Sequence, residues 1–290
     1  MASMAAMASR ENVRTAARRS RARVAHDRVS MNTPSNVPVQ RRTIAVLGIP
    51  VDADSQASML RRIAKWAQAG ESRYVCACNV HSLITATKSL GHLEALRGAD
   101  LVTPDGAPVA WMLRRLGAPE QDRVSGPDLM LEYCASAAVT GEPLFLFGGS
   151  DDTLRLLQER LLERWPQLRI AGAMSPPFRQ MSPEEDSEVI RRIGASGART
   201  VWVGLGCPKQ EIWMAAHRGL IPAVMIGVGA AFDFHAGTTP RAPAWMRRRG
   251  LEWLHRLASD PKRLWRRYLV TNTAFAWRAA LQLTKSRDRT

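Results

Sequence analysis

Short apolar runs rich in β-branched residues alternate along the chain with longer segments in which apolar residues recur at helical spacing. The short runs are predicted strands, at residues 43–50, 74–78, 100–103, 143–147, 168–173, 200–203 and 222–229. Helices are predicted between most of them, at residues 56–70, 83–97, 129–138, 152–165 and 184–194. Because strands that alternate with helices form parallel βαβ units, the pattern predicts an α/β fold with a Rossmann-like parallel sheet flanked by helices.

The strand predicted at residues 200–203 runs directly into a polar segment. Two glycines after the strand allow backbone to approach a ligand closely, a proline ends the strand, and three polar residues open a helix. Ligands of doubly wound α/β folds bind in the crevice beyond the carboxyl ends of the strands, where this segment would lie. The candidate binding residues of this segment are Gly204, Gly206, Pro208, Lys209, Gln210 and Glu211.

Other predicted strands end in similar polar turns. Asn79 and His81 follow the strand at residues 74–78, and Asp105 lies in a Pro-Asp-Gly sequence after the next strand. Such a sequence is typical of a β-turn, and it can also hold a carboxylate outside regular structure. Asp128 is predicted as the N-cap of the helix at residues 129–138. The other candidate residues of these turns are Gly126, Gly148 and Gly149.

The charge is distributed unevenly and divides the chain into three parts. The formal net charge is +15. Residues 1–42 have nine Lys or Arg and two acids, a net charge of +7, and residues 241–290 have thirteen Lys or Arg and three acids, a net charge of +10. Residues 43–240 therefore have a net charge of −2. We predict a disordered basic tail at 1–42, an α/β core at 43–240, and a helical appendage at 241–290 without which the core still folds. A nearly neutral core does not favour nucleic-acid binding, whereas a basic end suits an anionic ligand or an anionic membrane surface.

No apolar run reaches the roughly 18 residues that a membrane span needs, and no apolar segment of a secretory signal follows the N-terminal arginines. We therefore expect a cytoplasmic protein. The cysteines form neither a CxxC pair nor a zinc-type spacing, so reduced, packed thiols are expected. They are Cys76, Cys78, Cys134 and Cys207.

Tryptophan and arginine are interleaved in the last fifty residues. Tryptophan favours membrane interfaces and arginine binds phosphates bidentately, so the segment is typical of an amphipathic element that seeks anionic surfaces. A basic solvated tail packed through its tryptophans is the alternative interpretation. The residues concerned are Trp245, Trp253, Trp265, Trp277, Arg247, Arg248, Arg249, Arg256, Arg263, Arg266 and Arg267.

A series of short motifs occurs in order between about residue 43 and about residue 270. They are Asn79-Val-His81, Pro104-Asp105-Gly106, Arg123-Val-x-Gly126-x-Asp128, Phe145-x-Phe-Gly-Gly149, Val203-Gly-Leu-Gly-x-Pro-Lys-Gln-Glu211, Gly227-Val-Gly-Ala-Ala-Phe-Asp-Phe234, Arg241-Ala-Pro243, Gly250-Leu-Glu-Trp-Leu-x-Arg-Leu257, Pro261-x-Arg263 and Arg266-Arg-Tyr268. Each motif is weak alone, but in this order they are specific. Together they closely resemble the WecG/TagA/CpsF family of bacterial glycosyltransferases.

The resemblance implies transfer of a hexose or N-acetylhexosamine from a UDP-sugar, such as UDP-N-acetylmannosamine, to a polyprenyl-diphosphate-linked sugar in cell-surface polysaccharide biosynthesis. It implies a peripheral enzyme on an anionic membrane surface, at the inner face of the plasma membrane. A homo-oligomer is left open. Carried over by motif, the roles are Asp105 as general base, Asn79 shaping the pocket, Gln210 on the donor side, and Arg256, Arg263 and Arg266 reaching the site from the appendage.

Other classes of protein stay in view at this point. A nucleotide-dependent oxidoreductase would share the fold, but the two Gly-x-Gly sequences lack the third glycine of its fingerprint, so no cofactor is expected. No Asp-x-Asp pair follows a strand, so no metal ion is expected at the nucleotide site. A nucleic-acid-binding protein would explain the basic tail, and a non-catalytic binding module would need only the pocket.

Overall fold

The computed structural model of the chain describes residues 41–287, without the side chains of Arg263 and Arg287. The predicted disordered tail at residues 1–42 therefore lies outside the described residues, except for its last two positions. Arg41 is bonded to the folded part of the chain. Its Nε lies 3.0 Å from Oδ1 of Asp52, which is fully buried.

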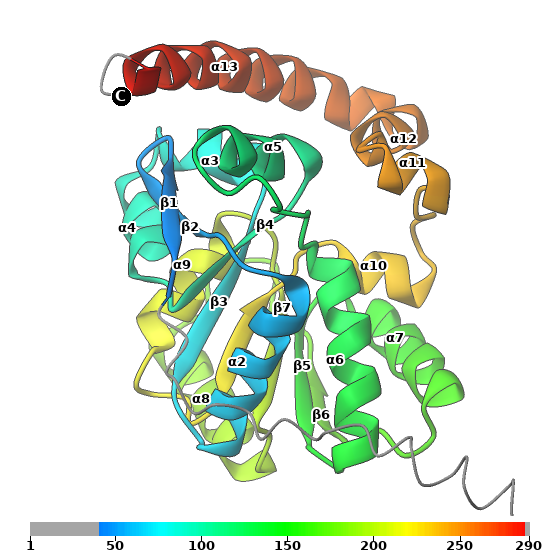
Figure 1. Cartoon of the computed structure of the whole chain (residues 1–290). Coiled ribbons are helices and arrows are strands. Elements are labelled where there is room, and N and C mark those ends of the chain that lie inside the picture. The colour runs from blue at the N-terminus through cyan, green and yellow to red at the C-terminus, as the bar shows by residue number, and fades with distance from the viewer. Residues whose placement is uncertain (1–40, 288–290) are drawn as a thin grey trace, which may run out of the picture. The chain divides into compact units, whose positions relative to one another are not determined.

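Six strands form one parallel sheet in the order β4-β3-β8-β7-β5-β6 (Figure 1). Their bounds are β3 Arg73–Cys78, β4 Leu101–Pro104, β5 Leu144–Gly148, β6 Ile170–Met174, β7 Thr200–Gly204 and β8 Val224–Gly227. The predicted Rossmann-like α/β fold is confirmed. Because the strands are parallel, their carboxyl ends lie along one edge of the sheet, which we call the carboxyl edge.

Alternating side chains of the strands bury both faces of the sheet. Phe145 and Phe147 pack in one cluster with α4, α8 and α9, whereas Leu144 and Leu146 pack in a second cluster with α2, α6 and α7. Such near-continuous apolar strands are typical of parallel sheets covered on both faces. The helices are α2 Gln56–Gln68, α3 Val80–Ala86, α4 Leu90–Gly98, α5 Ala107–Arg115, α6 Gly126–Thr140, α7 Asp151–Arg164, α8 Pro183–Ser196, α9 Lys209–His217 and α10 Ala231–Ala236.

The single strand predicted at residues 43–50 is wrong. The structure has two antiparallel strands there, β1 (Thr43–Val46) and β2 (Ile49–Asp52), in a separate two-stranded sheet. Leu47 and Gly48 form the turn, with φ of 49° and 82°. Positive φ at both central residues is the geometry of a two-residue hairpin turn. Such turns usually have Asn, Asp or Gly at the first position, and Leu47 occupies it here, so the sequence does not show the usual hairpin motif.

Three details of the predicted helices also differ. The single helix predicted at residues 83–97 is two helices, α3 and α4, with a break after Ala86. The N-cap of α6 is Ser125, whose side chain accepts a hydrogen bond from the backbone of Asp128, so the prediction of Asp128 as the cap is wrong. Helix α5 was not predicted at all. In the sequence, Pro108 suggests a turn. Proline is nevertheless tolerated in the first turn of a helix, because backbone N–H groups there make no hydrogen bond within the helix.

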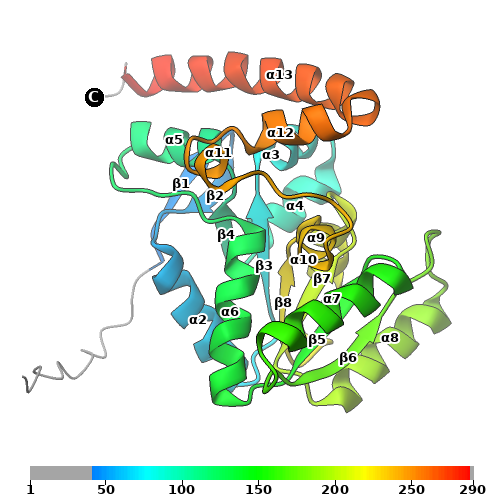
Figure 2. The same cartoon turned by 90° about the vertical axis from the view of Figure 1, so that its right-hand side faces the viewer.

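Three helices, α11 (Ala244–Arg248), α12 (Glu252–Ser259) and α13 (Pro261–Arg287), complete the described chain and lie at the carboxyl edge, with α13 packed along α3 (Figure 2). Phe275 and Ala279 of α13 are buried in the same apolar cluster as the β1–β2 hairpin. Gln282 accepts a hydrogen bond from N of Leu47 at 2.9 Å and donates one to O of Ala45 at 2.6 Å. Within residues 41–287, none of the helices combines the length and the apolar content that crossing a bilayer requires.

Candidate active site

Asp105 stands at the carboxyl edge, in the turn between β4 and α5. Asn79, which follows β3, donates from Nδ2 to Oδ2 of Asp105 at 3.3 Å, and its Oδ1 caps α3 by accepting from N of Ser82. Strands β3 and β4 are neighbours in parallel register, which brings the two turns together. The pair predicted from the sequence is therefore in contact.

The carboxyl of Asp105 lies in a recessed, charged environment. Burial raises its pKa above the ordinary value, although the charge of Arg123 and the hydrogen bond from Asn79 act in the opposite direction. Glu252 of α12 raises the pKa and Arg256 of the same helix lowers it. Asp105 is thus a carboxylate held by one amide and close to charges of the appendage, which suits a proton acceptor.

His81 projects from the first turn of α3 and is partly buried. Burial, together with the charges of Arg267, His92 and Arg256, lowers its pKa to about 4, so the imidazole is neutral near pH 7. Its Nδ1 lies 3.4 Å from the hydroxyl of Thr85, one turn along the helix. A neutral imidazole at this position can form hydrogen bonds with a sugar without adding charge.

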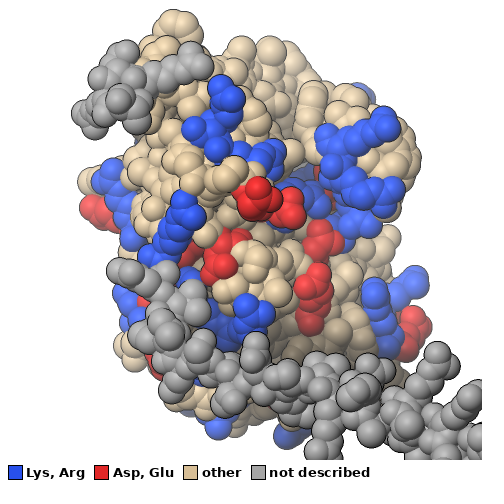
Figure 3. Space-filling model, in the orientation of Figure 1, with Lys and Arg blue, Asp and Glu red and all other residues tan. Residues whose placement is uncertain are grey.

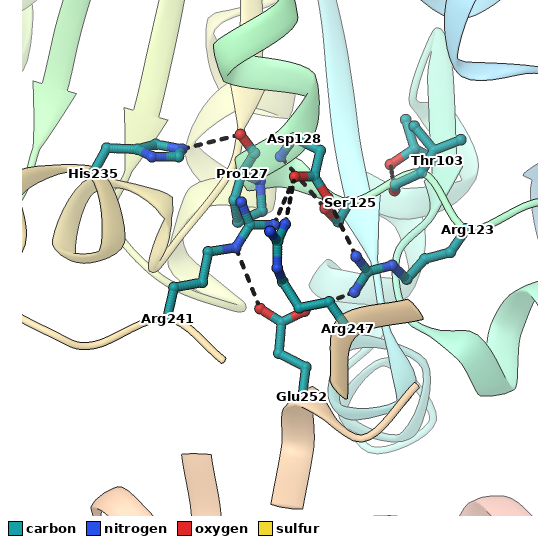
Figure 4. A network of polar contacts seen from close by, with 10 residues as sticks. Thr103, Arg123, Ser125, Pro127, Asp128, His235, Arg241, Arg247 and Glu252 are labelled. Carbon is teal, nitrogen blue, oxygen red and sulfur yellow. Dashed lines mark hydrogen bonds and ion pairs between the residues drawn. The ribbon is translucent and has the colours of Figure 1, made fainter. Parts of the chain in front are cut away.

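Asp128 is the centre of an ion-pair network that joins the core to the appendage (Figure 4). Its carboxylate binds Arg123 at 3.2 Å, Arg241 at 2.8 Å and Arg247 at 3.3 Å. Burial alone would raise the pKa of Asp128, but the hydrogen bond from Ser125 and the charges of Arg241 and Arg123 outweigh it, and the pKa is lowered. Asp128 is therefore ionised.

Glu252 of α12 is the second acid of this network. It accepts from Nη1 of Arg123 at 2.6 Å and lies 3.6 Å from Nε of Arg241. The Nε of Arg247, although buried, has no hydrogen-bond partner. Three guanidinium groups thus share two carboxylates, which leaves a positive surplus that an anion such as a diphosphate could neutralise.

The predicted glycines permit close backbone approach at the carboxyl edge. A Cβ on Gly148, whose φ is 119°, would lie 2.6 Å from the backbone carbon of Gly204 on the neighbouring strand β7. A side chain at Gly126 would press against Val228, at 3.3 Å. Gly149 and Gly206 continue the same turns with φ of 74° and 78°. These positions keep the loops after β5, β7 and β8 tightly packed.

The segment after β7 is more buried than a ligand-binding loop alone would require. Lys209 is exposed at the start of α9, preceded by Pro208 at the N-cap. Gln210 is 3% exposed and accepts from N of Gly229 at 3.0 Å, while its amide donates to Glu211 at 2.9 Å. Glu211 is fully buried. Gln210 and Glu211 therefore connect the loops after β7 and β8, and both polar groups of Gln210 are used within the protein.

Of the three appendage arginines assigned to the site from the sequence, only Arg256 is found near Asp105 and His81 among the described side chains. Arg256 is partly buried and lies over the ring of Phe234, 5.4 Å from its centroid. Arg266 is exposed, 6.0 Å from the ring of Trp265, whereas the charge of Arg267 acts on His81. Arg263 belongs to α13, but its side chain lies outside the described residues.

Four residues of this region were not among the predicted site residues. They are Arg123, Arg241, Arg247 and Glu252. Arg123 and Arg241 stand within motifs quoted from the sequence, so the signal was present, but a charge pattern cannot show which arginines meet which acids. Three of the contacts join residues more than one hundred positions apart, for example Arg123 and Glu252.

The carboxyl edge of this Rossmann-like sheet brings together a carboxylate, a neutral imidazole and several guanidinium groups. In α/β proteins of this class, ligands bind beyond the carboxyl ends of the strands, and these groups are suited to an anionic ligand there. A sequence model of the glycosyl transferase WecG/TagA/CpsF family matches residues 44–289. The chain belongs to this family and is a glycosyltransferase of cell-surface polysaccharide synthesis. Membership gives no support to the oxidoreductase, nucleic-acid-binding or non-catalytic interpretations.

Proposed function

We propose that the enzyme transfers a hexose or N-acetylhexosamine, of the N-acetylmannosamine type, from UDP to a sugar linked to polyprenyl diphosphate. The observation that carries this proposal is the hydrogen-bonded pair of Asp105 and Asn79 beside the arginine network. Transfer to a hydroxyl requires a base for its proton, and departure of UDP requires a positive site for the diphosphate. The two requirements are supplied by neighbouring loops of the carboxyl edge.

In this proposal Asp105 accepts the proton of the acceptor hydroxyl as the new glycosidic bond forms, and the bond from the anomeric carbon to UDP breaks. Asn79 holds the carboxylate in place. Arg123 of the core, together with Arg247, Arg256 and Arg267 of the appendage, stabilises the charge that develops on the departing diphosphate. Guanidinium groups suit this task because they bind phosphate oxygens bidentately.

We further propose that the appendage rests on the inner face of the plasma membrane, where a polyprenyl acceptor is held. Figure 3 shows Lys and Arg gathered over α11 and α12, and Arg248 and Arg249 are exposed there. An apolar groove of about 400 Å³ lies between α12 and α13. It is lined by Trp253, Leu257, Trp265, Tyr268, Leu269, Asn272 and Thr273. Aromatic and basic groups side by side fit the interface of an anionic bilayer.

The test of this function is a panel of UDP-sugars offered with a short-chain polyprenyl-diphosphate sugar, with products identified by mass spectrometry. We expect one UDP-sugar to yield a product heavier by one sugar residue, with release of UDP. A panel in which only a sugar linked to another nucleotide is transferred, or none is, would contradict the proposed donor class. The family assignment does not depend on this result.

We expect transfer to continue in the presence of EDTA. Asp105 is bound to an amide, and Asp128 and Glu252 are bound to guanidinium groups, so arginines rather than a bridging Mg²⁺ neutralise charge in this proposal. The measurement is the initial rate with EDTA added to the assay, and without it. Loss of activity that is restored by Mn²⁺ would show that the donor needs a metal.

The pH dependence of transfer should report on the carboxyl of Asp105. A general base works in its ionised form, and burial raises the pKa of this carboxyl above its ordinary value of 3.8. We therefore expect kcat/KM to fall as the pH is lowered through a value above 3.8, because protonation removes the base. The residual activity of Asp105→Asn should lack this decline. If the decline persists in that variant, another group is responsible.

A further inference from the structure

Three potential metal ligands meet below the loop that follows β7. Among the described residues, His92 of α4, Cys207 of the loop and Glu211 of α9 place one ligand atom each within 4.8 Å of one another. Nε2 of His92 lies 3.8 Å from Oε2 of Glu211 and 3.9 Å from Sγ of Cys207. His92 and Glu211 are fully buried and Cys207 is partly buried.

The polar atoms of this cluster are incompletely satisfied. Oε2 of Glu211 and Nδ1 of His92 are buried and have no hydrogen-bond partner. The other carboxylate oxygen of Glu211 is occupied by the amide of Gln210. A buried carboxylate is costly when one of its oxygens has neither a cation nor a hydrogen bond, so Oε2 needs either a proton or a cation.

We propose that His92, Cys207 and Glu211 bind a zinc ion. With tetrahedral angles and ordinary bond lengths to zinc, the nitrogen would lie about 3.6 Å from the sulfur and about 3.4 Å from the oxygen. The observed separations exceed these by only a few tenths of an ångström. A thiolate and a carboxylate also balance the charge of a divalent ion, and a zinc ion would remove the unsatisfied oxygen of Glu211.

The ligand types favour zinc over the other common ions. Mg²⁺ and Ca²⁺ are bound by sets of oxygen atoms, and a thiolate with an imidazole is a poor match for them. The hydroxyl of Ser82 also lies close to this cluster, 3.3 Å from Nε2 of His92. A water molecule would complete a tetrahedral site.

The ion would have a structural role that bears on the active site. It would tie α4 to the loop after β7, and Gln210, which neighbours Glu211, holds N of Gly229 in the loop after β8. Two loops of the carboxyl edge would thus be fixed by one ion. His92 and Cys207 are 115 positions apart, which explains why the sequence showed no zinc-type spacing.

The first experiment measures zinc in the purified full chain by mass spectrometry after loading with zinc and dialysis. We expect about one zinc per chain in the wild type, and a loss of at least about tenfold in Cys207→Ser and Glu211→Gln. Cys134→Ser is the matched control, because Cys134 is also buried but packs in the other apolar cluster. It should retain zinc. A wild type without zinc, or a Cys207→Ser variant that binds zinc equally well, overturns the proposal.

A second measurement uses only the wild type, in case the variants do not fold. Cobalt added to zinc-free protein should give a thiolate-to-metal charge-transfer absorption in the near ultraviolet, and zinc should remove it. Failure to observe the band in folded protein that takes up cobalt excludes Cys207 as a ligand. Neither measurement uses a sugar substrate, so the zinc site can fail while the proposed transfer stands. An enclosed ion also exchanges slowly, so brief EDTA in the transfer assay leaves it in place.

Discussion

Replacement of Asp105 by Asn is expected to lower turnover by at least about 10²-fold while the fold and UDP binding are retained. General-base assistance typically contributes about 10²- to 10⁴-fold, and an amide cannot accept the proton of the acceptor hydroxyl. The side chains have the same shape, and the contact with Asn79 can be kept as a bond between two amides. The measurement is the turnover number with saturating UDP-sugar and lipid acceptor. Circular dichroism checks the fold, and titration with UDP checks nucleotide binding.

The matched control for this variant is Asp122→Asn. Asp122 is exposed and lies next to Arg123, so it tests whether any loss of negative charge near the site is enough. We expect its turnover to match the wild type. If Asp105→Asn is folded, binds UDP and turns over like the wild type, Asp105 is not the base and the role passes to another group of the carboxyl edge.

Replacement of Trp265 and Trp277 by Ala is expected to weaken binding to anionic vesicles by roughly 30-fold. The two rings are 52% and 68% exposed on α13, so their removal leaves the packed side of the helix intact. Each ring that enters the interface would contribute about 1 kcal/mol, a fraction of what complete burial of a large apolar side chain gives. The measurement is co-sedimentation with vesicles that contain anionic lipid.

Phe178→Ala is the control for this double variant. Phe178 is 87% exposed in the segment between β6 and α8, away from the appendage. Its removal should leave vesicle binding unchanged. Turnover of the double Trp variant on a water-soluble acceptor should also stay near that of the wild type, because neither ring contacts Asp105. Unchanged vesicle binding in the double variant would show that these rings do not touch the bilayer.

Much of the fold could be predicted from the sequence because the apolar strands are buried on both faces. β5 and β7 are short, largely apolar runs that end in glycine, a composition that is typical of strands buried on both faces of a parallel sheet. The β1–β2 hairpin could not be predicted in the same way. Its turn residue Leu47 looks like part of a longer strand, and only the tertiary contact with Gln282 shows that its N–H is used elsewhere.

Site residues that directly follow strands could be predicted from the sequence. The ion pairs between distant segments could not. Asp105 and Asn79 follow neighbouring strands, so their proximity follows from the topology. Two of the three arginine partners of Asp128 come from the segment after α10 and from α11, and nothing local in the sequence orients those two arginines. The same holds for His92 and Cys207, whose elements meet only in the folded chain.

The sequence also favoured a boundary near residue 240, with an appendage that could be removed. The structure gives a reason to prefer point substitutions. Phe275 and Ala279 fill the apolar cluster that includes the hairpin, so truncation would expose it to water. Loss of activity in a truncated chain would then not distinguish a missing membrane contact from an open core.

The hydrogen bonds of Gln282 to the backbone of Leu47 and Ala45 can form only late in synthesis on the ribosome. The hairpin leaves the ribosome early, but its partner is made 235 residues later. At about 5 to 20 residues per second, that interval is roughly 10 to 50 s. During this time α13 is not yet present to cover the hairpin and its apolar cluster. Chaperones can bind the apolar surface that is exposed in the nascent chain. Helix α13 can pack only on a core whose other parts already exist, so a chain that stalls early never completes the surface that we propose to contact the bilayer.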